Sequence, residues 1–306
     1  MLKGIDVSEH QGRIDWDRVK DKIDFAIIRE GWGSHTTDSQ ADRNVRECNR
    51  LGIPVGLYHF SYAYTIDMAI HEAHLCIEFA KKYRIDYPIV YDLERASLEY
   101  AKKVGKPISR RLATDMAKAF MKEVEKAGYY AMLYANPDLL NNVYYKDELR
   151  PRFALWLAWY KASISSAKKY DPKIFQYSEE GTISGIGTHS VDLNYGFEDM
   201  AETIRRKGLN HLDGSKPTYH KPSSPSYKLV PQHGTCTIVV DKLNIREKPS
   251  TNSEIVGSYT RGESVIYDYY VDSEGYRWIS WIGASGKRRY MAVRVLSTNK
   301  RYGKCV

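Results

Sequence analysis

Eight short segments with the character of buried strands follow one another over the first two hundred residues. Most are apolar or aromatic and are bounded by Gly, Pro, Asn or Asp, a pattern typical of β-strands. They occupy residues 4–8, 25–30, 54–60, 88–94, 131–136, 155–160, 174–178 and 190–195. A fold built around these eight strands is therefore the first requirement that the sequence sets.

Helical patterns separate the earlier strand segments. Residues 109–127 place apolar side chains on one stripe, with Ser109 as a helix N-cap and Gly128 just past the end. Residues 67–83 are similar, and residues 41–51 form a shorter version. Too little chain separates the last three strand segments for regular helices. The pattern predicts an α/β fold: an irregular (β/α) barrel of eight strands, with helices sparse in the last third.

The fourth strand segment ends in two carboxylates, Asp92 and Glu94. Because side chains alternate along a strand, both should point to the same face, about 6–7 Å apart along the chain. Burying two carboxylates costs desolvation energy that a purely structural protein has little reason to accept. Paired carboxylates with separated pKa values are what cleavage of a glycosidic bond requires. The alternative is a solvated strand end whose Asp caps the next helix.

The barrel nominates further residues by position, because active sites of such barrels lie at the C-terminal ends of the strands. Asp6 lies in the first strand segment and Asp192 in the eighth. These two strands are neighbours when a barrel closes, so the two carboxylates should lie near each other. We expect both to orient the substrate or the carboxylate pair; strand-end capping is the alternative.

Further side chains at the strand ends are candidates for binding a sugar. They are Tyr58, Phe60, Tyr134, Trp159 and Gln176. Aromatic faces stack on sugar rings, but aromatic residues on strands are more often part of the core. We therefore expect about half of the four aromatic residues to face a substrate.

The sequence predicts no metal and no cofactor. His71 and His74 are spaced i, i+3 in a predicted helix, without the i, i+4 spacing of zinc proteases or an evident third ligand.

Cys48 and Cys76 are predicted to be buried thiols. Cys236 and Cys305 bracket the C-terminal module and would meet if its ends are adjacent. Nothing else indicates an oxidising compartment, so their bonding is left open.

Residues 209–233 change character, being rich in Pro and Ser without periodicity, which predicts a semi-stiff linker between a domain at 1–208 and one at 234–306. Short alternating strands and turns in the last segment predict a small all-β barrel or sandwich. The strands are expected at 236–240, 243–246, 255–259, 264–271, 278–281 and 289–295. Modules of this size usually bind something rather than catalyse.

Almost all of the net charge of +8 lies in the C-terminal part. Residues 209–306 contain 15 Lys and Arg and 8 Asp and Glu, which leaves +1 for the rest. The C-terminal part should therefore attract a polyanion. The basic run at 287–289 has no recognisable nucleic-acid fold around it, so nucleic acid is not expected as a partner.

The N-terminus lacks the apolar core of a signal peptide, and no run approaches membrane-spanning length. We therefore expect a protein that is made in the cytoplasm and does not insert into a membrane.

Several motifs in the large domain resemble family 25 of the glycoside hydrolases, the N-acetylmuramidases. They fall in the family's order over residues 1–205. The motifs are GIDVSEHQG at 4–12, AIIR at 26–29, GLYHF at 56–60, VYDLE at 90–94, LWLAWY at 155–160, FQY at 175–177 and VDLN at 191–194. The resemblance implies hydrolysis of the β-1,4 bond between N-acetylmuramic acid and N-acetylglucosamine in peptidoglycan.

On this reading Glu94 is the general acid that protonates the leaving oxygen, with a pKa raised by burial and by the Asp92 charge. Asp92 stays ionised and stabilises positive charge at the reacting sugar, or orients its 2-acetamido group. The strand spacing does not choose between retaining, substrate-assisted and inverting mechanisms.

The C-terminal module resembles a bacterial SH3-type domain through LNIREKPS at 243–250, WISW at 278–281 and GKRRYMAV at 286–293. The resemblance implies a wall-binding domain for peptide stems or anionic wall polymers beside the glycan strands. Candidate wall-binding residues are Trp278, Trp281, Arg288 and Tyr290.

This combination is similar to a bacteriophage endolysin that is made in the host cytoplasm and released with the help of a holin to attack Gram-positive walls. Three alternatives remain: a bacterial autolysin, a wall-binding protein without hydrolysis, and a barrel acting on another amino-sugar polymer such as chitin.

Overall fold

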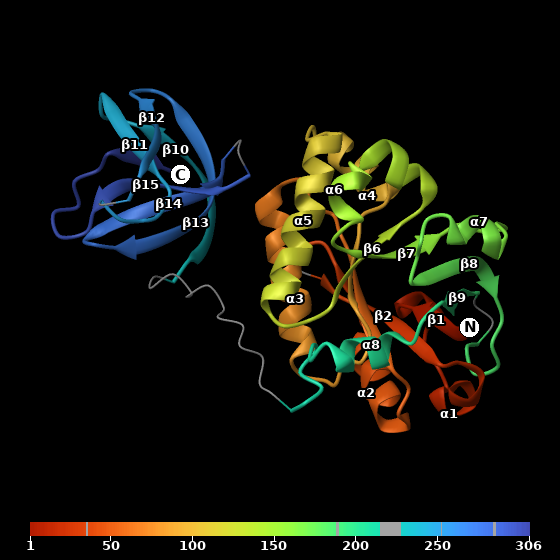
Figure 1. The fold of residues 1–306 in the computed structure, drawn as a ribbon. Coiled ribbons are helices and arrows are strands. Elements are labelled where there is room, and N and C mark those ends of the chain that lie inside the picture. The colour runs from red at the N-terminus through yellow and green to blue at the C-terminus, as the bar shows by residue number, and fades with distance from the viewer. Residues whose placement is uncertain (35, 188–189, 215–227, 252, 284–285) are drawn as a thin grey trace. The chain divides into compact units, whose positions relative to one another are not determined.

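The computed structural model describes residues 1–34, 36–187, 190–214, 228–251, 253–283 and 286–306. The chain divides into two compact units, Met1–Tyr219 and His220–Val306 (Figure 1). Residues 215–227 of the predicted linker lie outside the described residues, so the domain limits 208, 209, 233 and 234 stay predictions.

Eight strands of the first unit close into a barrel, which confirms the predicted fold. Their order around the barrel is β1, β9, β8, β7, β6, β5, β4 and β2, and β2 pairs with β1 to close the ring. The strands are β1 (Leu2–Val7), β2 (Phe25–Trp32), β4 (Val55–Phe60), β5 (Ile89–Asp92), β6 (Ala131–Ala135), β7 (Ala154–Ala158), β8 (Ile174–Gly181) and β9 (Val191–Gly196). A short strand, β3 (Thr36–Thr37), extends β2 as a hairpin.

One barrel strand runs against the others. β9 is antiparallel to both β8 and β1, whereas the other neighbouring barrel strands are parallel. Nine residues separate the end of β8 from the start of β9. A parallel connection needs a crossover of a dozen or more residues, so this one returns as a hairpin. The N-terminal end of β9, which carries Asp192, therefore lies at the mouth where its neighbours end.

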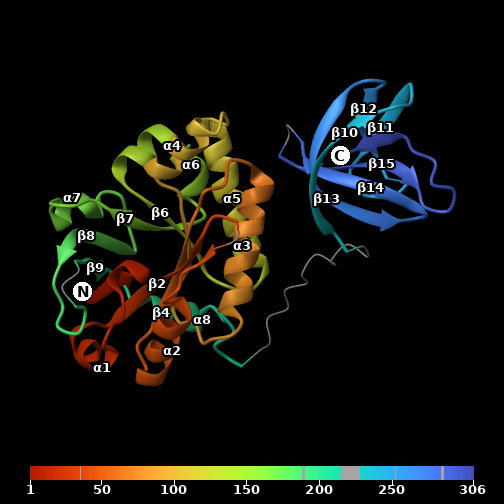
Figure 2. The same ribbon diagram turned by 180° about the vertical axis from the view of Figure 1, so that it is seen from behind.

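The three predicted helices are present as α2 (Ala41–Leu51), α3 (Ile66–Ala80) and α5 (Arg110–Lys126). The Ser109 side chain caps α5 by accepting a hydrogen bond from the Leu112 N–H, and Gly52 ends α2 in the left-handed conformation, at φ 71°. α3 and α5 pack side by side on one side of the barrel (Figures 1 and 2).

The remaining helices were not predicted. They are α1 (Trp16–Val19), α4 (Arg95–Lys103), α6 (Lys146–Leu149), α7 (Ile164–Lys168) and α8 (Met200–Arg206), with single turns at Glu9–Gln11, Lys20–Lys22 and Leu139–Val143. The five residues of α7 agree with the expectation of little helix in the last third. α4 starts directly after Glu94 and so forms part of the barrel mouth.

The two faces of the barrel wall pack into separate apolar clusters. Val90 and Met132 belong to the interior cluster, whereas Tyr91 packs outward against Phe120 of α5, with ring centroids 5.0 Å apart. Because side chains alternate along β5, Asp92 shares the interior face with Val90. The regular strand pattern thus places a carboxylate inside the mouth of the barrel.

The second unit is a seven-stranded antiparallel sheet in the order β12, β11, β15, β14, β13, β10 and β16. Its strands are β10 (Val230–Ile238), β11 (Lys242–Arg246), β12 (Ile255–Thr260), β13 (Ser264–Ser273), β14 (Tyr276–Ile282), β15 (Arg288–Val295) and β16 (Gly303–Cys305). Six correspond to predicted strands, and β16 was not predicted. Cys236 lies directly opposite Cys305, and the two form a disulfide that joins β10 to β16.

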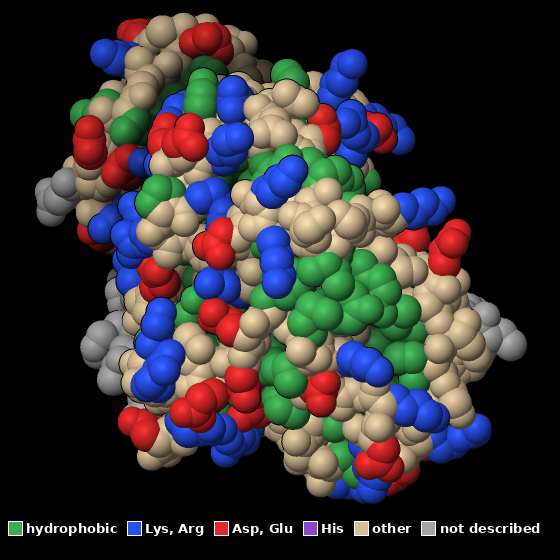
Figure 3. Space-filling model, turned by 45° about the vertical axis from the view of Figure 1, so that its right-hand side comes forward, with side chains coloured by type: hydrophobic (Ala, Val, Ile, Leu, Met, Phe, Trp, Pro, Cys, Tyr) green, Lys and Arg blue, Asp and Glu red, His purple; other side chains and the backbone are tan. Residues whose placement is uncertain are grey.

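The surface shown in Figure 3 carries basic and acidic side chains interspersed with one another, with apolar side chains gathered between them. Within the described ranges, every helix is too short or too polar to cross a membrane.

Candidate active site

The strands bring the predicted carboxylates to one mouth of the barrel. Asp6 on β1 lies directly opposite Asp192 on β9, as barrel closure predicts. Asp92 ends β5, and Glu94 follows it as the N-cap of α4. The Glu94 backbone N–H donates to Ser97 Oγ at 3.2 Å, which fixes the start of the helix. Glu94 is therefore held at the junction of a barrel strand and the helix that covers its end.

A network of side-chain amides holds Asp6. Gln176 Nε2 donates to Asp6 Oδ2 at 2.9 Å and to Asp192 Oδ2 at 3.2 Å. Asn194 Nδ2 donates to the same oxygen of Asp6 at 2.7 Å. Two phenols, those of Tyr134 and Tyr160, donate to Gln176 Oε1 at 2.8 and 3.0 Å. A carboxylate that is held this closely is suited to positioning other groups rather than to reacting.

Gln176 supports the carboxylate network, and its predicted contact with a substrate stays a prediction. Asn194 and Tyr160 were not predicted as site residues. Asn194 is fixed in turn by the indole of Trp156, whose Nε1 donates to Asn194 Oδ1 at 2.7 Å. Because side chains alternate along a strand, Asn194, two residues after Asp192, could have been placed on the same face of β9 from the sequence.

Asp92 is the most isolated of the four carboxylates. It is 3% exposed, and its Oδ1 has no hydrogen-bond partner among the described residues. Burial raises the pKa of Asp92 well above its usual value, and the charges of Glu94 and Asp6 raise it further against the opposing charge of Arg29. The lack of a protein donor to this buried oxygen leaves the charged form of Asp92 poorly compensated.

Burial also raises the pKa of Glu94, and the negative charges of Asp192 and Glu179 add to this effect. The sequence had led us to expect that the charge of Asp92 does so and that Asp92 stays ionised. In the structure, the repulsion between Asp92 and Glu94 instead favours the protonated form of Asp92, because Asp92 is the more deeply buried of the two. The pair therefore holds a proton more readily than isolated carboxyls do.

The predicted sugar-binding aromatics divide into two groups. Tyr58 and Tyr134 both pack edge-on against Trp156, with ring centroids 6.1 and 4.8 Å away, and Tyr134 is 8% exposed. Phe60 and Trp159 are partly exposed. Tyr134 is therefore a core and network residue, whereas Tyr58, Phe60 and Trp159 are all partly exposed and stay candidates for contact with a sugar.

A groove of about 690 Å³ is lined on one side by Ala96, Glu99 and Tyr100 of α4. The aromatic rings of Trp32, Tyr62 and Tyr100 also line it, and the last two pack edge-on with centroids 5.2 Å apart. Tyr100 was not predicted as a site residue because its helix, α4, was not predicted, and Trp32 and Tyr62 were not among the predicted residues. The three rings give the groove an aromatic surface suited to sugar rings.

Three of the four predicted wall-binding residues are core residues instead. Trp278, Trp281 and Tyr290 are 1%, 8% and 5% exposed, and they pack in the two apolar clusters of the C-terminal domain. Arg288 pairs with Asp268 through two hydrogen bonds of 2.6 and 2.9 Å. A domain this small needs its largest aromatics for the core, so a structural role replaces their predicted contact with the wall.

His71 and His74 lie on α3, where they contact Ser34 O and Glu123 Oε2. Groups of three His, Cys, Asp or Glu that could share a metal ion do not occur in the described part of the chain. Cys48 and Cys76 are buried and unbonded, as predicted.

Comparison with protein families agrees with this geometry. The model of the glycosyl hydrolases family 25 matches residues 5–186, and that of the bacterial SH3 domain matches residues 231–293. The uncharacterized protein YegX of Escherichia coli K12 is 27% identical over 227 residues, which make up 71% of this chain and 75% of that protein.

Two solved structures are similar to the first unit. The modular autolysin LytC from Streptococcus pneumoniae, solved in complex with a synthetic peptidoglycan ligand, is 32% identical with a TM-score of 0.56. The match covers 63% of this chain and 46% of LytC, less than half of that chain. A family 25 glycosyl hydrolase from Bacillus anthracis is 27% identical with a TM-score of 0.55, covering 67% and 93%. The chain belongs to the glycosyl hydrolases family 25 and carries a bacterial SH3 domain after its catalytic barrel.

Proposed function

We propose that this glycoside hydrolase cleaves the β-1,4 bond between N-acetylmuramic acid and N-acetylglucosamine in Gram-positive cell walls, with Glu94 as its general acid. The observation that carries the proposal is the group of four carboxylates at one barrel mouth, all with raised pKa values. Glycosidic cleavage needs an acid that stays protonated near neutral pH beside a second carboxylate. Release of reducing ends from purified peptidoglycan, and not from chitin, tests the substrate class.

The four carboxylates divide the work according to their surroundings. Glu94 is more accessible than Asp92 and protonates the leaving oxygen. Asp92 is the second carboxylate of the pair, because it lies close enough to Glu94 for the Glu94 charge to raise its pKa. Asp92 must release its proton to water before it can stabilise the positive charge that develops on the sugar. Alternatively, Asp92 orients the 2-acetamido group. Asp6 and Asp192 are positioning residues.

The pH dependence of hydrolysis should respond to Glu179, an exposed residue on β8 whose negative charge raises the pKa of Glu94. An acid catalyst works while it is protonated, so activity should fall as the pH rises through the pKa of Glu94. Glu179→Gln removes a charge that opposes ionisation. The alkaline limb of the kcat/KM profile should therefore move to lower pH.

The neighbouring substitution Glu180→Gln is the matched control, because Glu180 is equally exposed on the same strand and its charge is not among those that raise the pKa of Glu94. Added salt should shrink the difference between the Glu179→Gln variant and the native protein. If the pH profiles of kcat/KM for Glu179→Gln and Glu180→Gln coincide, the ionisation of Glu94 does not cause the alkaline limb.

The SH3 domain is proposed to hold the enzyme on the wall. A chain without this domain tests that role.

The contacts of Asn210 decide where such a chain can end, because Asn210 is buried in the barrel unit. Its Oδ1 accepts from the Tyr130 N–H at 2.7 Å, and its Nδ2 donates to the carbonyls of Ile85 and Tyr87. A chain cut before Asn210 would lose these bonds. A truncated chain that tests the SH3 domain should therefore end at Gly214.

We expect the chain of residues 1–214 to cleave soluble glycan fragments at the native rate, because the carboxylate network lies wholly within it. Lysis of whole Gram-positive cells, followed by turbidity, should be slower by at least about tenfold, because the second binding module is lost. Unchanged lysis by the shorter chain would refute a targeting role for the SH3 domain.

A further inference from the structure

Three arginines form a row across the C-terminal domain. Arg277 on β14 lies directly opposite Arg294 on β15, and Arg294 forms a bridge with Arg301, which precedes β16. Like charges that face each other across strands destabilise a sheet. The repulsion within a row of three guanidinium groups therefore lowers the stability of the folded domain unless anions bind to the row.

The domain compensates the row only in part. Asp272 lies opposite Arg277 on β13 and accepts from its Nε and Nη2 at 2.8 and 2.7 Å. Among the described residues, Arg294 and Arg301 form no ion pair with a carboxylate. Asp272 also interacts with Arg294, whose charge helps to lower the pKa of Asp272, but the two form no ion pair. Arg294 and Arg301 can therefore both bind an anion from outside the protein.

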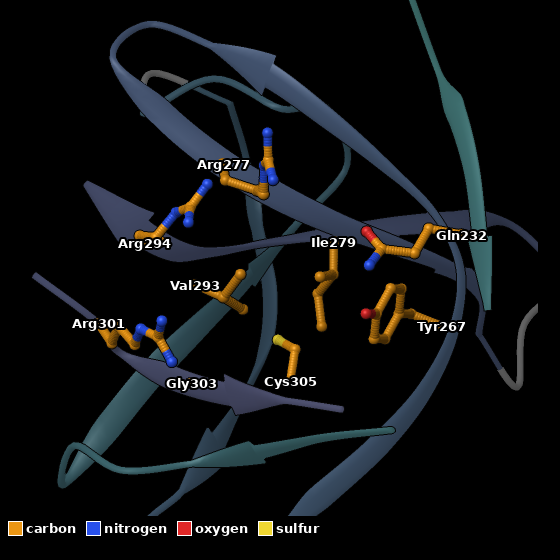
Figure 4. A pocket seen from close by; sticks show the side chains of 9 residues that line it. All are labelled: Gln232, Tyr267, Arg277, Ile279, Val293, Arg294, Arg301, Gly303 and Cys305. Atoms are coloured by element: carbon orange, nitrogen blue, oxygen red, sulfur yellow. The ribbon is translucent and has the colours of Figure 1, made fainter. Parts of the chain in front are cut away.

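A pocket of about 150 Å³ lies beside the row and differs from a plain basic surface (Figure 4). Its inner wall is apolar and consists of Ile279, Val293 and the disulfide sulfur of Cys305. Figure 4 shows the three guanidinium groups on one side and the side chains of Gln232 and Tyr267 on the other. The pocket therefore offers positive charge, an apolar surface and an amide within one small space.

These features together select a ligand class. Guanidinium groups bind carboxylates through paired hydrogen bonds. An amide side chain both donates and accepts, as a peptide backbone requires, and an apolar wall gains free energy by covering a small aliphatic group. A phosphate polymer would use the charges and leave the apolar wall uncovered.

We propose that this pocket binds the free carboxylate end of a wall peptide whose last residue has a small apolar side chain. Arg294 and Arg301 hold the carboxylate, Gln232 contacts the peptide backbone, and the terminal methyl group lies on Ile279 and Val293. The inference rests on the proposed function in one respect, since peptidoglycan supplies such peptides.

Part of the pocket lies outside the range that matches the bacterial SH3 domain. Arg294, Arg301 and Cys305 lie beyond residue 293, where the match to the bacterial SH3 domain ends. The disulfide fastens β16 to β10 and so keeps this last segment in place beside the pocket.

The test titrates the full-length protein with N-acetyl-D-alanyl-D-alanine and follows the methyl resonances of Ile279 and Val293. The free acid should bind and shift these resonances, and the C-terminal amide of the same peptide should bind at least about tenfold more weakly. Equal affinities of the native protein for the acid and for the amide would overturn the proposal. Tighter binding of glycerol phosphate would overturn it in favour of a phosphate polymer.

The double variant Arg294→Gln, Arg301→Gln should weaken binding of the acid at least about tenfold. Arg261→Gln is the control, because Arg261 is paired with Asp241 and does not line the pocket. The single variant Arg294→Gln should unfold at the native temperature or above, since it relieves repulsion in the row. Native affinity in the double variant would contradict the proposal.

Two readouts separate this proposal from the proposed hydrolysis. The double variant should still release reducing ends from soluble glycan fragments. Conversely, the Glu94→Gln protein should bind the peptide with native affinity, whatever its hydrolytic activity. Loss of peptide binding in Glu94→Gln would overturn the assignment of the pocket as an independent site.

Discussion

Replacement of Glu94 by Gln is expected to lower the hydrolysis of purified peptidoglycan by about 10²–10⁴-fold, the range that general acid catalysis contributes. The amide has the shape of the carboxyl but cannot transfer a proton to the leaving oxygen. The rate is measured as release of new reducing ends.

Folding should not change in this variant. The contact that fixes Glu94 at the start of α4 is made by its backbone N–H to Ser97, and Gln preserves it. Thermal unfolding should therefore coincide with that of the native protein, and Glu180→Gln should keep full activity. A Glu94→Gln protein with more than a tenth of native activity would move the acid role to another carboxyl, with Asp92 first in line.

Removal of the disulfide by the pair Cys236→Ala, Cys305→Ala is expected to lower the free energy of unfolding of the C-terminal domain by about 4 kcal/mol. The bond joins residues that are 69 positions apart, so it closes most of the domain into one loop. A domain of this size has a small core and little stability to spare. The variant domain should therefore be largely unfolded at 37 °C.

Denaturant unfolding of the full chain measures this effect, with fluorescence of the C-terminal tryptophans as the signal. A reductant should reproduce the loss in the native protein and leave the double variant unchanged. Hydrolysis of soluble fragments reports on the barrel and should persist. A variant that unfolds at the native denaturant concentration would show that the disulfide adds nothing to stability.

The barrel was predictable because its signals are local. Strand segments, helix caps and helical stripes can be recognised from residues that are close in the sequence. Closure of the ring then places Asp6 opposite Asp192. The direction of β9 was also within reach, since the short connection after β8 forbids a parallel crossover. α4 was not, because it begins at a Glu, a weak N-cap, and buries only Ser97 and Ala101.

Features that depend on distant contacts escaped prediction. The amides that hold Asp6 come from β8 and β9, and only the folded barrel brings them together. The disulfide depends on β16, a strand of three residues that carries no periodic signal. Trp278 and Trp281 lie in a motif that predicts exposed binding residues. Both are buried, because a small domain needs its largest side chains to form a core.

Identification of the cleaved bond tests the central claim most directly. Purified Gram-positive peptidoglycan is digested, the new reducing ends are labelled by borohydride reduction, and the products are analysed by mass spectrometry. The proposed function predicts reduced N-acetylmuramic acid at the new ends, and none from the Glu94→Gln protein. Reduced N-acetylglucosamine, or no new ends at all, would contradict it.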